Sequence, residues 1–294
     1  MQAHSHHFRK MNGLGNDFVV LDARSRALPL SPETVRAIAD PKQGIGCDQL
    51  IALEPSDRAD VFMRIFNADG GEVGACGNAA RCVAALVAAE RGQPKVSIET
   101  ESGVLGADVN QDGSVTIDMG APRFAWNEIP LAEPFHDTRR IELQIGPIDD
   151  PVLHSPSVVN VGNPHCLFFV DDVEAHDLAR FGPMLEHHPL FPERANISLV
   201  QVLAPDAIKV RTWERGAGLT RACGTAACAA AVAAARRDLT GHNVKVSLPG
   251  GDLLIEWREE DGHILMTGPY ALDYEDTLPA TIFAPARFEE QGMP

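Results

Sequence analysis

Short runs in which apolar and polar residues alternate recur along the chain, and they predict β-strands. Such runs include VFMRIF (61–66), KVSIET (95–100), IKVRTW (208–213) and LLIEW (253–257), which are rich in β-branched and other apolar residues. Two alanine-rich stretches, 78–92 and 225–237, contain no proline and are apolar on nearly every face, which is typical of buried helices. The segment 31–40 predicts a surface helix, with Ser31 as N-cap and Pro32 in its first turn.

The sequence also repeats itself. The words ACGNAA and ACGTAA contain Cys76 and Cys223, which are 147 residues apart in a chain of 294. The same offset pairs further polar residues: Asn16 with Asn163, Gln49 with Asn196, and Asn67 with Glu214. Polar matches held at one offset over this length indicate a duplication. We therefore expect an α/β fold of two pseudosymmetric duplicated domains, each a curved, mostly antiparallel sheet wrapped around a central helix.

The repeat also sets the expected domain boundaries. The first half covers residues 1–122 and the second covers 123–271, with the break near Pro122. The tail at 272–294 has no counterpart in the first half.

Composition narrows the choice of partners and compartment. The net charge of −16 argues against a nucleic-acid partner, because binding to a phosphate backbone needs a basic protein surface. The longest mainly apolar stretch, Cys82–Ala89, is far shorter than a bilayer span, so no membrane association is expected. The amino-terminal residues have no apolar signal segment, which favours the cytoplasm. The six cysteines are expected to be reduced, and without a C-x-x-C word they predict no metal site.

Cys76 and Cys223 are the candidate reactive groups. Each follows a glycine-rich loop and precedes a predicted helix, whose N-terminal dipole should lower the thiol pKa. The free backbone N–H groups of Gly77-Asn78 and Gly224-Thr225 could hold a carboxylate. If the two halves face each other, the α-carbon of that carboxylate would lie between two sulfurs. One thiolate could then remove the α-hydrogen while the opposite thiol delivers a proton, which inverts the centre.

Other paired polar residues fit a binding role. The neutral amides of Asn16, Asn67, Asn163 and Asn196 can both donate and accept hydrogen bonds, although asparagine beside glycine also forms turns. Glu214 and Arg215 offer a carboxylate for an ammonium group and a guanidinium for a carboxylate, or they form a surface ion pair. His165 could help to deprotonate a cysteine or could be a core histidine, and the sequence leaves both open.

The chain resembles the diaminopimelate epimerase family. The resemblance is carried by FRKMNGLGNDFVVLD, GIGCDQL, RIFNADGGEVGACGNAARC, NVGNPHC, NISLVQV and WERGAGLTRACGTAAC, in this order, and runs from about Phe8 to Pro269. It implies a cofactor-independent epimerase that interconverts LL- and meso-2,6-diaminopimelate, in lysine and peptidoglycan precursor biosynthesis. It also implies a homodimer and a C-terminal segment, 272–294, that returns to the first domain.

The resemblance assigns roles residue by residue. It implies that Cys76 and Cys223 are the acid/base thiols, that His165 and Glu214 assist them, and that the reacting carboxylate is held by the backbone of Gly77, Asn78, Gly224 and Thr225. The implied substrate contacts are Asn16, Gln49, Asn67, Asn163, Asn196, Glu214 and Arg215. Two positions depart from the family pattern: Ala79 replaces a usual glycine, and Leu219 replaces a usual glutamate.

Two alternatives remain at this point. A proline or hydroxyproline racemase shares the duplicated plan, but its usual CGH and DRSPCGTG words are absent here. From another class, the chain could be an amino-acid-binding protein that uses Cys76 and Cys223 as a thiol switch. A pyridoxal-phosphate racemase is disfavoured because none of the five lysines lies in a glycine-loop setting.

Overall fold

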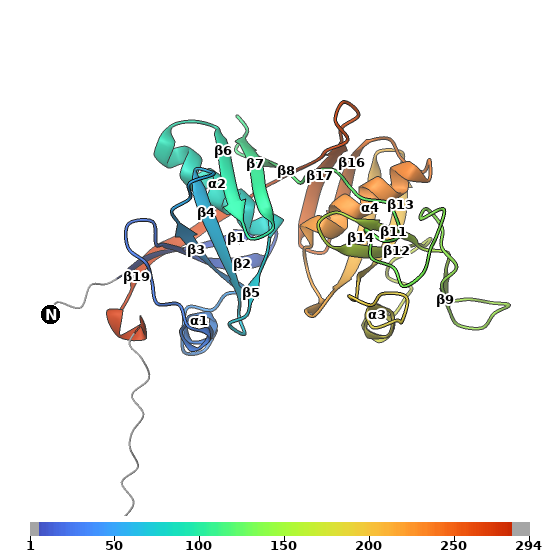
Figure 1. Cartoon of the computed structure of the whole chain (residues 1–294), viewed down its shortest axis with the longest axis horizontal. Helices are drawn as coiled ribbons and strands as arrows, with labels where there is room; N and C mark the ends of the chain where they lie inside the picture. The colour runs from blue at the N-terminus through green and yellow to red at the C-terminus, as the bar shows by residue number, and fades with distance from the viewer. Residues whose placement is uncertain (1–5, 284–294) are drawn as a thin grey trace, which may run out of the picture.

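The computed structural model describes residues 6–283 and shows two lobes of similar construction side by side (Figure 1). The strands of the first lobe are β1 (His6–Gly13), β2 (Asn16–Asp22), β3 (Gln49–Glu54), β4 (Val61–Asn67), β5 (Glu72–Val73), β6 (Lys95–Thr100), β7 (Gly103–Val109) and β8 (Val115–Asp118). Its helices are α1 (Pro32–Ala39) and α2 (Gly77–Arg91).

The second lobe begins with a separate two-stranded sheet and then repeats this order. Its strands are β9 (Gln144–Ile145), β10 (Leu153–His154), β11 (Ser157–Asn160), β12 (Pro164–Phe169), β13 (Asn196–Ala204), β14 (Ala207–Glu214), β15 (Gly218–Leu219), β16 (Asn243–Leu248), β17 (Gly251–Trp257) and β18 (Ile264–Gly268). Its helices are α3 (Leu178–Glu186) and α4 (Gly224–Arg236), and the chain continues into β19 (Ala271–Leu278) and the 3₁₀ helix η1 (Ala280–Phe283).

The pairing of the strands confirms the duplication predicted from the sequence. In the first lobe β2–β3 and β4–β6 are parallel, and in the second lobe the matching pairs β12–β13 and β14–β16 are parallel. The other strand pairings within residues 6–283 are antiparallel. Each lobe is thus a mostly antiparallel sheet around a central helix, as expected.

Two strand pairings cross between the lobes. The antiparallel pair β8–β18 joins the last strands of the two repeats, with Ile117 opposite Met266. Strand β19 then crosses back and pairs with β1 over Asn12–His6, which is visible in Figure 1 as the red strand entering the blue lobe. Of the expected domain ranges, residues 1–5 and 284–294 lie outside the described residues.

The central helices are buried because their side chains are small. Helix α4 has alanine at eight of its thirteen positions, and strands of the second lobe pack against it on several sides. Helices α2 and α4 belong to one continuous apolar core that spans both lobes. None of the helices in the described part of the chain is long and apolar enough to cross a membrane.

The two outer helices occupy equivalent places. Helix α1 begins at the Ser31 cap, whose hydroxyl accepts from the Thr34 N–H at 3.3 Å, as predicted. Helix α3 lies at the matching position of the second lobe and covers a separate apolar cluster. Helix α3 is not predicted from the sequence, because Pro183 inside it interrupts the helical pattern.

Candidate active site

Both candidate cysteines are N-cap residues. Cys76 precedes α2 and Cys223 precedes α4, each in extended backbone conformation immediately before the first helical glycine. The Cys76 sulfur accepts the Ala79 N–H at 3.5 Å, whereas Cys223 makes no cap hydrogen bond and instead lies 3.5 Å from the Thr225 hydroxyl. The thiols therefore lie at the positive ends of two buried helices, as the repeat predicted.

The two helix N-termini meet at the boundary between the lobes. A Cβ added to Gly77 would lie 2.6 Å from Met266 Cε, and one added to Gly224 would lie 2.9 Å from Met266 Sδ. The Asn78 amide, on α2, donates to the Ala222 carbonyl at 3.2 Å, one residue before Cys223. Any side chain at these two first helical positions would require Met266 to move.

The thiol pKa values differ from the sequence-based expectation. Burial raises the pKa of the Cys76 thiol to about 11, and the hydrogen bond from Ala79 opposes this only in part. Burial also raises the pKa of Cys223 well above its usual range, and the nearby Glu214 carboxylate adds to the rise. The expected lowering by the helix dipole is therefore wrong for this structure, because exclusion of water outweighs one helix end.

Glu214 connects the two sides of the site. Its carboxylate accepts a hydrogen bond from Thr220, interacts with Cys223 through a second hydrogen bond, and acts electrostatically on Cys76. Burial raises the pKa of Glu214, which makes this group a better proton acceptor than an exposed glutamate. The 147-residue offset pairs Glu214 with Asn67 in the first lobe, which is neutral.

His165 is fully buried and reaches the thiols only through other residues. Its Nε2 lies 2.8 Å from Asn163 Oδ1, and the Asn163 amide donates to Thr225 Oγ1 at 3.3 Å, beside Cys223. Burial, helped by the Arg215 charge, lowers the pKa of His165 to about 3, so the ring is neutral at pH 7. A neutral ring that donates from Nε2 orients Asn163 and thereby Thr225.

The side-chain amide of Asn196 holds the backbone near the remaining candidate residues of the second lobe. The Asn196 carbonyl oxygen accepts the backbone N–H of Arg215 at 2.9 Å, and its nitrogen donates to the Pro164 carbonyl at 3.2 Å. The Arg215 guanidinium is exposed and donates to the Glu193 carbonyl at 2.9 Å. Asn196 thus fixes the start of the glycine loop that ends at Cys223.

In the first lobe the candidate residues form two small groups. Asn16 Oδ1 lies 4.0 Å from the Cys76 sulfur, while its nitrogen donates to Asp48 at 2.9 Å. Gln49 and Asn67 are opposite each other on β3 and β4, and the Gln49 amide donates to Asn67 at 3.0 Å. The Gln49 Oε1 atom is buried and has no hydrogen-bond partner among residues 6–283.

The two departures from the family pattern do not displace the thiols. Ala79 is buried, and it supplies a backbone N–H to Cys76 that any residue at this position would supply. Leu219 is exposed on β15, opposite Trp213 on β14.

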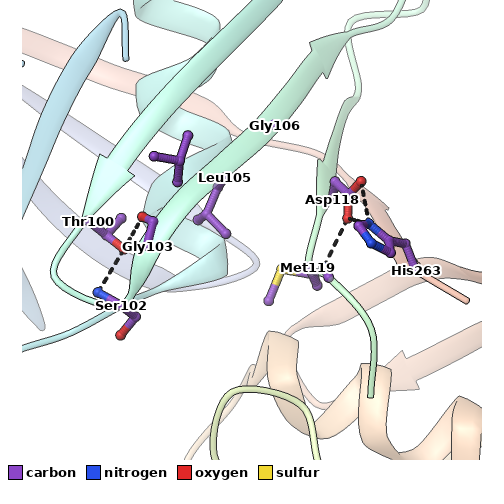
Figure 2. Close-up of a pocket in the computed structure, with 10 residues that line it drawn as sticks. Thr100, Ser102, Gly103, Leu105, Gly106, Asp118, Met119 and His263 are labelled. Carbon is purple, nitrogen blue, oxygen red and sulfur yellow. Dashed lines mark hydrogen bonds and ion pairs between the residues drawn. The ribbon is translucent and has the colours of Figure 1, made fainter. Parts of the chain in front are cut away.

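A surface cavity of about 270 Å³ lies next to the Cys76 helix (Figure 2). Figure 2 shows the Asp118 carboxylate next to His263 on one side of it, and the segment 100–106, where β6 turns into β7, on the other. The His263 Nδ1 atom lies 2.9 Å from Asp118 Oδ1. Met119 lines this cavity and lies within 4 Å of a Cβ added to Gly77. Within residues 6–283, no group of three or more histidine, cysteine or acidic side chains is placed to hold a metal ion.

Sequence reasoning missed one charged residue at this boundary. Arg81, in the second turn of α2, is completely buried and donates to Asn78, next to the thiol helix end. A single arginine inside an otherwise apolar, alanine-rich stretch is the signal that could have identified it.

Comparison with solved structures defines the fold. A hydroxyproline epimerase from Agrobacterium vitis matches with a TM-score of 0.65 at 16% identity, covering 94% of this chain and 92% of that one. A phenazine biosynthesis protein of the PhzF family from Bacillus anthracis matches with a TM-score of 0.64 at 19% identity, covering 94% and 99% of the two chains. The chain therefore has the fold of these proteins. In this chain a cysteine caps each central helix.

Sequence comparison then defines the family. The diaminopimelate epimerase profile matches residues 8–125 and 157–272. The diaminopimelate epimerase of Afipia carboxidovorans is 56% identical over 285 residues, covering 95% of this chain and 97% of the relative. That of a Methylobacterium species is also 56% identical, covering 96% and 98%. The chain belongs to the diaminopimelate epimerase family and is an isomerase.

Proposed function

We propose that this chain interconverts LL- and meso-2,6-diaminopimelate by inverting one α-carbon between Cys76 and Cys223, without a cofactor. The observation that carries this proposal is the pair of cysteine N-caps on two buried helices whose first glycines contact the same Met266 side chain. A carboxylate bound by both helix ends would leave its α-carbon next to both thiols.

The reaction needs one thiolate and one thiol. The thiolate takes the α-hydrogen as a proton, the electron pair of the broken C–H bond passes into the carboxylate, and the opposite thiol donates its proton to the other face. Glu214 can generate the Cys223 thiolate by accepting its proton, since the two groups share a hydrogen bond. Backbone N–H groups at the helix ends stabilise the negative charge that develops on the carboxylate.

The high thiol pKa values set the energetic requirement. At pH 7 a thiol with a pKa of about 11 is four units from half-ionisation, which corresponds to about 5 kcal/mol for forming the thiolate. A buried thiolate is in turn a strong base towards a carbon acid. Binding of the substrate ammonium beside the thiols would offset part of this cost.

The remaining candidate residues are proposed to bind the substrate. Arg215 and the amides would hold the amino-acid centre that does not react, and the unpartnered Gln49 Oε1 offers an acceptor for an ammonium group. The proposed contacts are Asn16, Gln49, Asn67, Asn163, Asn196, Glu214 and Arg215, with the backbone of Gly77, Asn78, Gly224 and Thr225 around the reacting carboxylate. His165 is proposed to position Asn163.

The cellular setting is also proposed. We expect a homodimer in the cytoplasm that takes part in lysine and peptidoglycan precursor biosynthesis. We further propose that residues 1–122 with the 272–294 segment and residues 123–271 act as two domains.

A chromatographic assay of LL-diaminopimelate conversion tests the function. We expect meso product from the purified chain, and turnover below about a hundredth of wild type in Cys76→Ala and Cys223→Ala. Cys166→Ala, which removes a buried thiol from the second apolar cluster, should retain turnover. Comparable turnover of proline by the wild type would instead favour the proline racemase alternative.

A further inference from the structure

Arg81 is a buried cation without an acidic partner. Its side chain is fully inaccessible to solvent, and among residues 6–283 no carboxylate lies within ion-pair distance of it. Burying a guanidinium in this way costs folding free energy unless other groups compensate. The proposed reaction does not use Arg81, so its place in the fold needs another explanation.

The guanidinium contacts join the two lobes at the thiol helices. Nη2 donates to Asn78 Oδ1 at 3.1 Å, Nε donates to the Pro269 carbonyl at 3.0 Å, and Nη1 lies 3.9 Å from Met266 Sδ. Asn78 in turn donates to the Ala222 carbonyl. One side chain on α2 therefore orients the amide that holds the Cys223 loop and contacts the methionine between the two helix ends.

The pseudosymmetry of the chain is broken at this residue. The 147-residue offset places Arg81 on Cys228, a buried cysteine of α4 that interacts electrostatically with Arg81. Repeat-related residues that face each other lie near the pseudosymmetry axis. An arginine in place of Cys228 would put a second buried cation close to Arg81, and the two charges would repel each other.

We propose that Arg81 is a positioning residue for the two-thiol reaction. It fixes the Cys223 loop against the Cys76 helix through Asn78, and its uncompensated charge stabilises anions at the two helix N-termini. This inference rests on the proposed function. The titratable groups that face Cys76 are Glu214 from β14 and, from α2 itself, Arg81 and Cys82. Of these, Arg81 is the positive one, so it favours the Cys76 thiolate that Glu214 disfavours.

Two variants separate the geometric and electrostatic parts. Arg81→Lys keeps the charge but loses the planar donor fork, and Arg81→Met loses both. We expect kcat to fall at least about tenfold in both, with a smaller change in KM. The rate of Cys76 alkylation by iodoacetamide can be followed by mass spectrometry as a function of pH. We expect the midpoint of this alkylation profile to move about one unit to higher pH in Arg81→Met and to stay unshifted in Arg81→Lys. Arg91→Met, on the same helix but paired with Asp60, should change neither measurement.

An unshifted alkylation profile in a folded Arg81→Met, together with turnover within threefold of wild type, would overturn the proposal. If Arg81→Met does not fold, Arg81→Lys decides: reduced turnover with an unshifted profile supports the proposal, and wild-type turnover overturns it. The alkylation measurement needs no substrate. It therefore tests the Arg81 charge even if the wild type fails to convert diaminopimelate, which would contradict the proposed function alone.

Discussion

The chemistry of individual residues in this site depends on how far the fold excludes water from them. Burial raises the pKa of Cys76 to about 11 and lowers that of His165 to about 3, so both side chains are neutral at pH 7. The repeated words single out the two cysteines in the sequence, whereas for His165 the sequence left an assisting role and a core role open. It did not predict the direction of the thiol shift, because burial comes from strands far away in the chain.

The buried His165 makes a defined contribution to acid sensitivity. A histidine whose folded pKa lies below its ordinary value of 6.5 stabilises the fold above pH 6.5, and this contribution is lost as the pH falls towards 3. At pH 4.5 the loss amounts to about 3 kcal/mol. His165→Gln should therefore lose less stability than wild type between pH 7 and pH 4.5. Urea unfolding at both pH values measures this, and equal pH dependence in the two proteins would refute it.

At the scale of single elements, the central helices are defined by small side chains. The alanine-rich pattern predicted α2 and α4 and their burial, since no polar face is available for solvent. Helix α3 was not predicted because Pro183 interrupts the helical pattern of its sequence. The helix is stabilised instead by packing over the second apolar cluster. Arg81 was overlooked within the α2 pattern for a related reason, since its partners Asn78, Met266 and Pro269 are assembled by both lobes.

Close packing around α2 can be tested with one enlarged side chain. Ala84 is fully buried in the core, whereas Ala89, on the same helix, is exposed. Ala84→Leu should lower the free energy of unfolding by about 1–3 kcal/mol, because extra methylenes in a filled core force neighbours apart. Ala89→Leu should stay within about 0.5 kcal/mol of wild type. Chemical denaturation compares the pair, and an equally small effect at Ala84 would mean that the core has spare room.

At the scale of the whole molecule, the site depends on contact between the two lobes. The turn that contains Leu14 and Gly15 in the first lobe packs on the Gly250 turn and on Arg221 of the second. The repeat predicted two similar halves but not how they touch, because contacts between unlike surfaces of the two repeats leave no periodic signal. The crossing strands β8–β18 and β1–β19 reinforce this contact.

A methyl group at Gly250 should open this boundary. A Cβ there would lie 2.0 Å from the Leu14 carbonyl oxygen and 3.0 Å from that of Arg221, and backbone atoms cannot rotate away as a side chain can. Gly250→Ala should lower kcat at least about tenfold, since displacement of reacting groups by about 1 Å is costly. Gly241→Ala, whose added Cβ first meets an atom at 4.0 Å, is the matched control. Full activity in Gly250→Ala would show that the lobes need not meet in this way.

Isotope labelling in heavy water tests the two-thiol mechanism most directly. A thiol holds a single proton that exchanges with solvent, so the donating cysteine carries deuterium, whereas the cysteine that removed the substrate hydrogen can return only that hydrogen. Early in the conversion of LL-diaminopimelate, we predict that mass spectrometry finds deuterium at the inverted α-carbon of the meso product and almost none in the recovered substrate. Equal deuterium in substrate and product, or product without deuterium, would contradict the account.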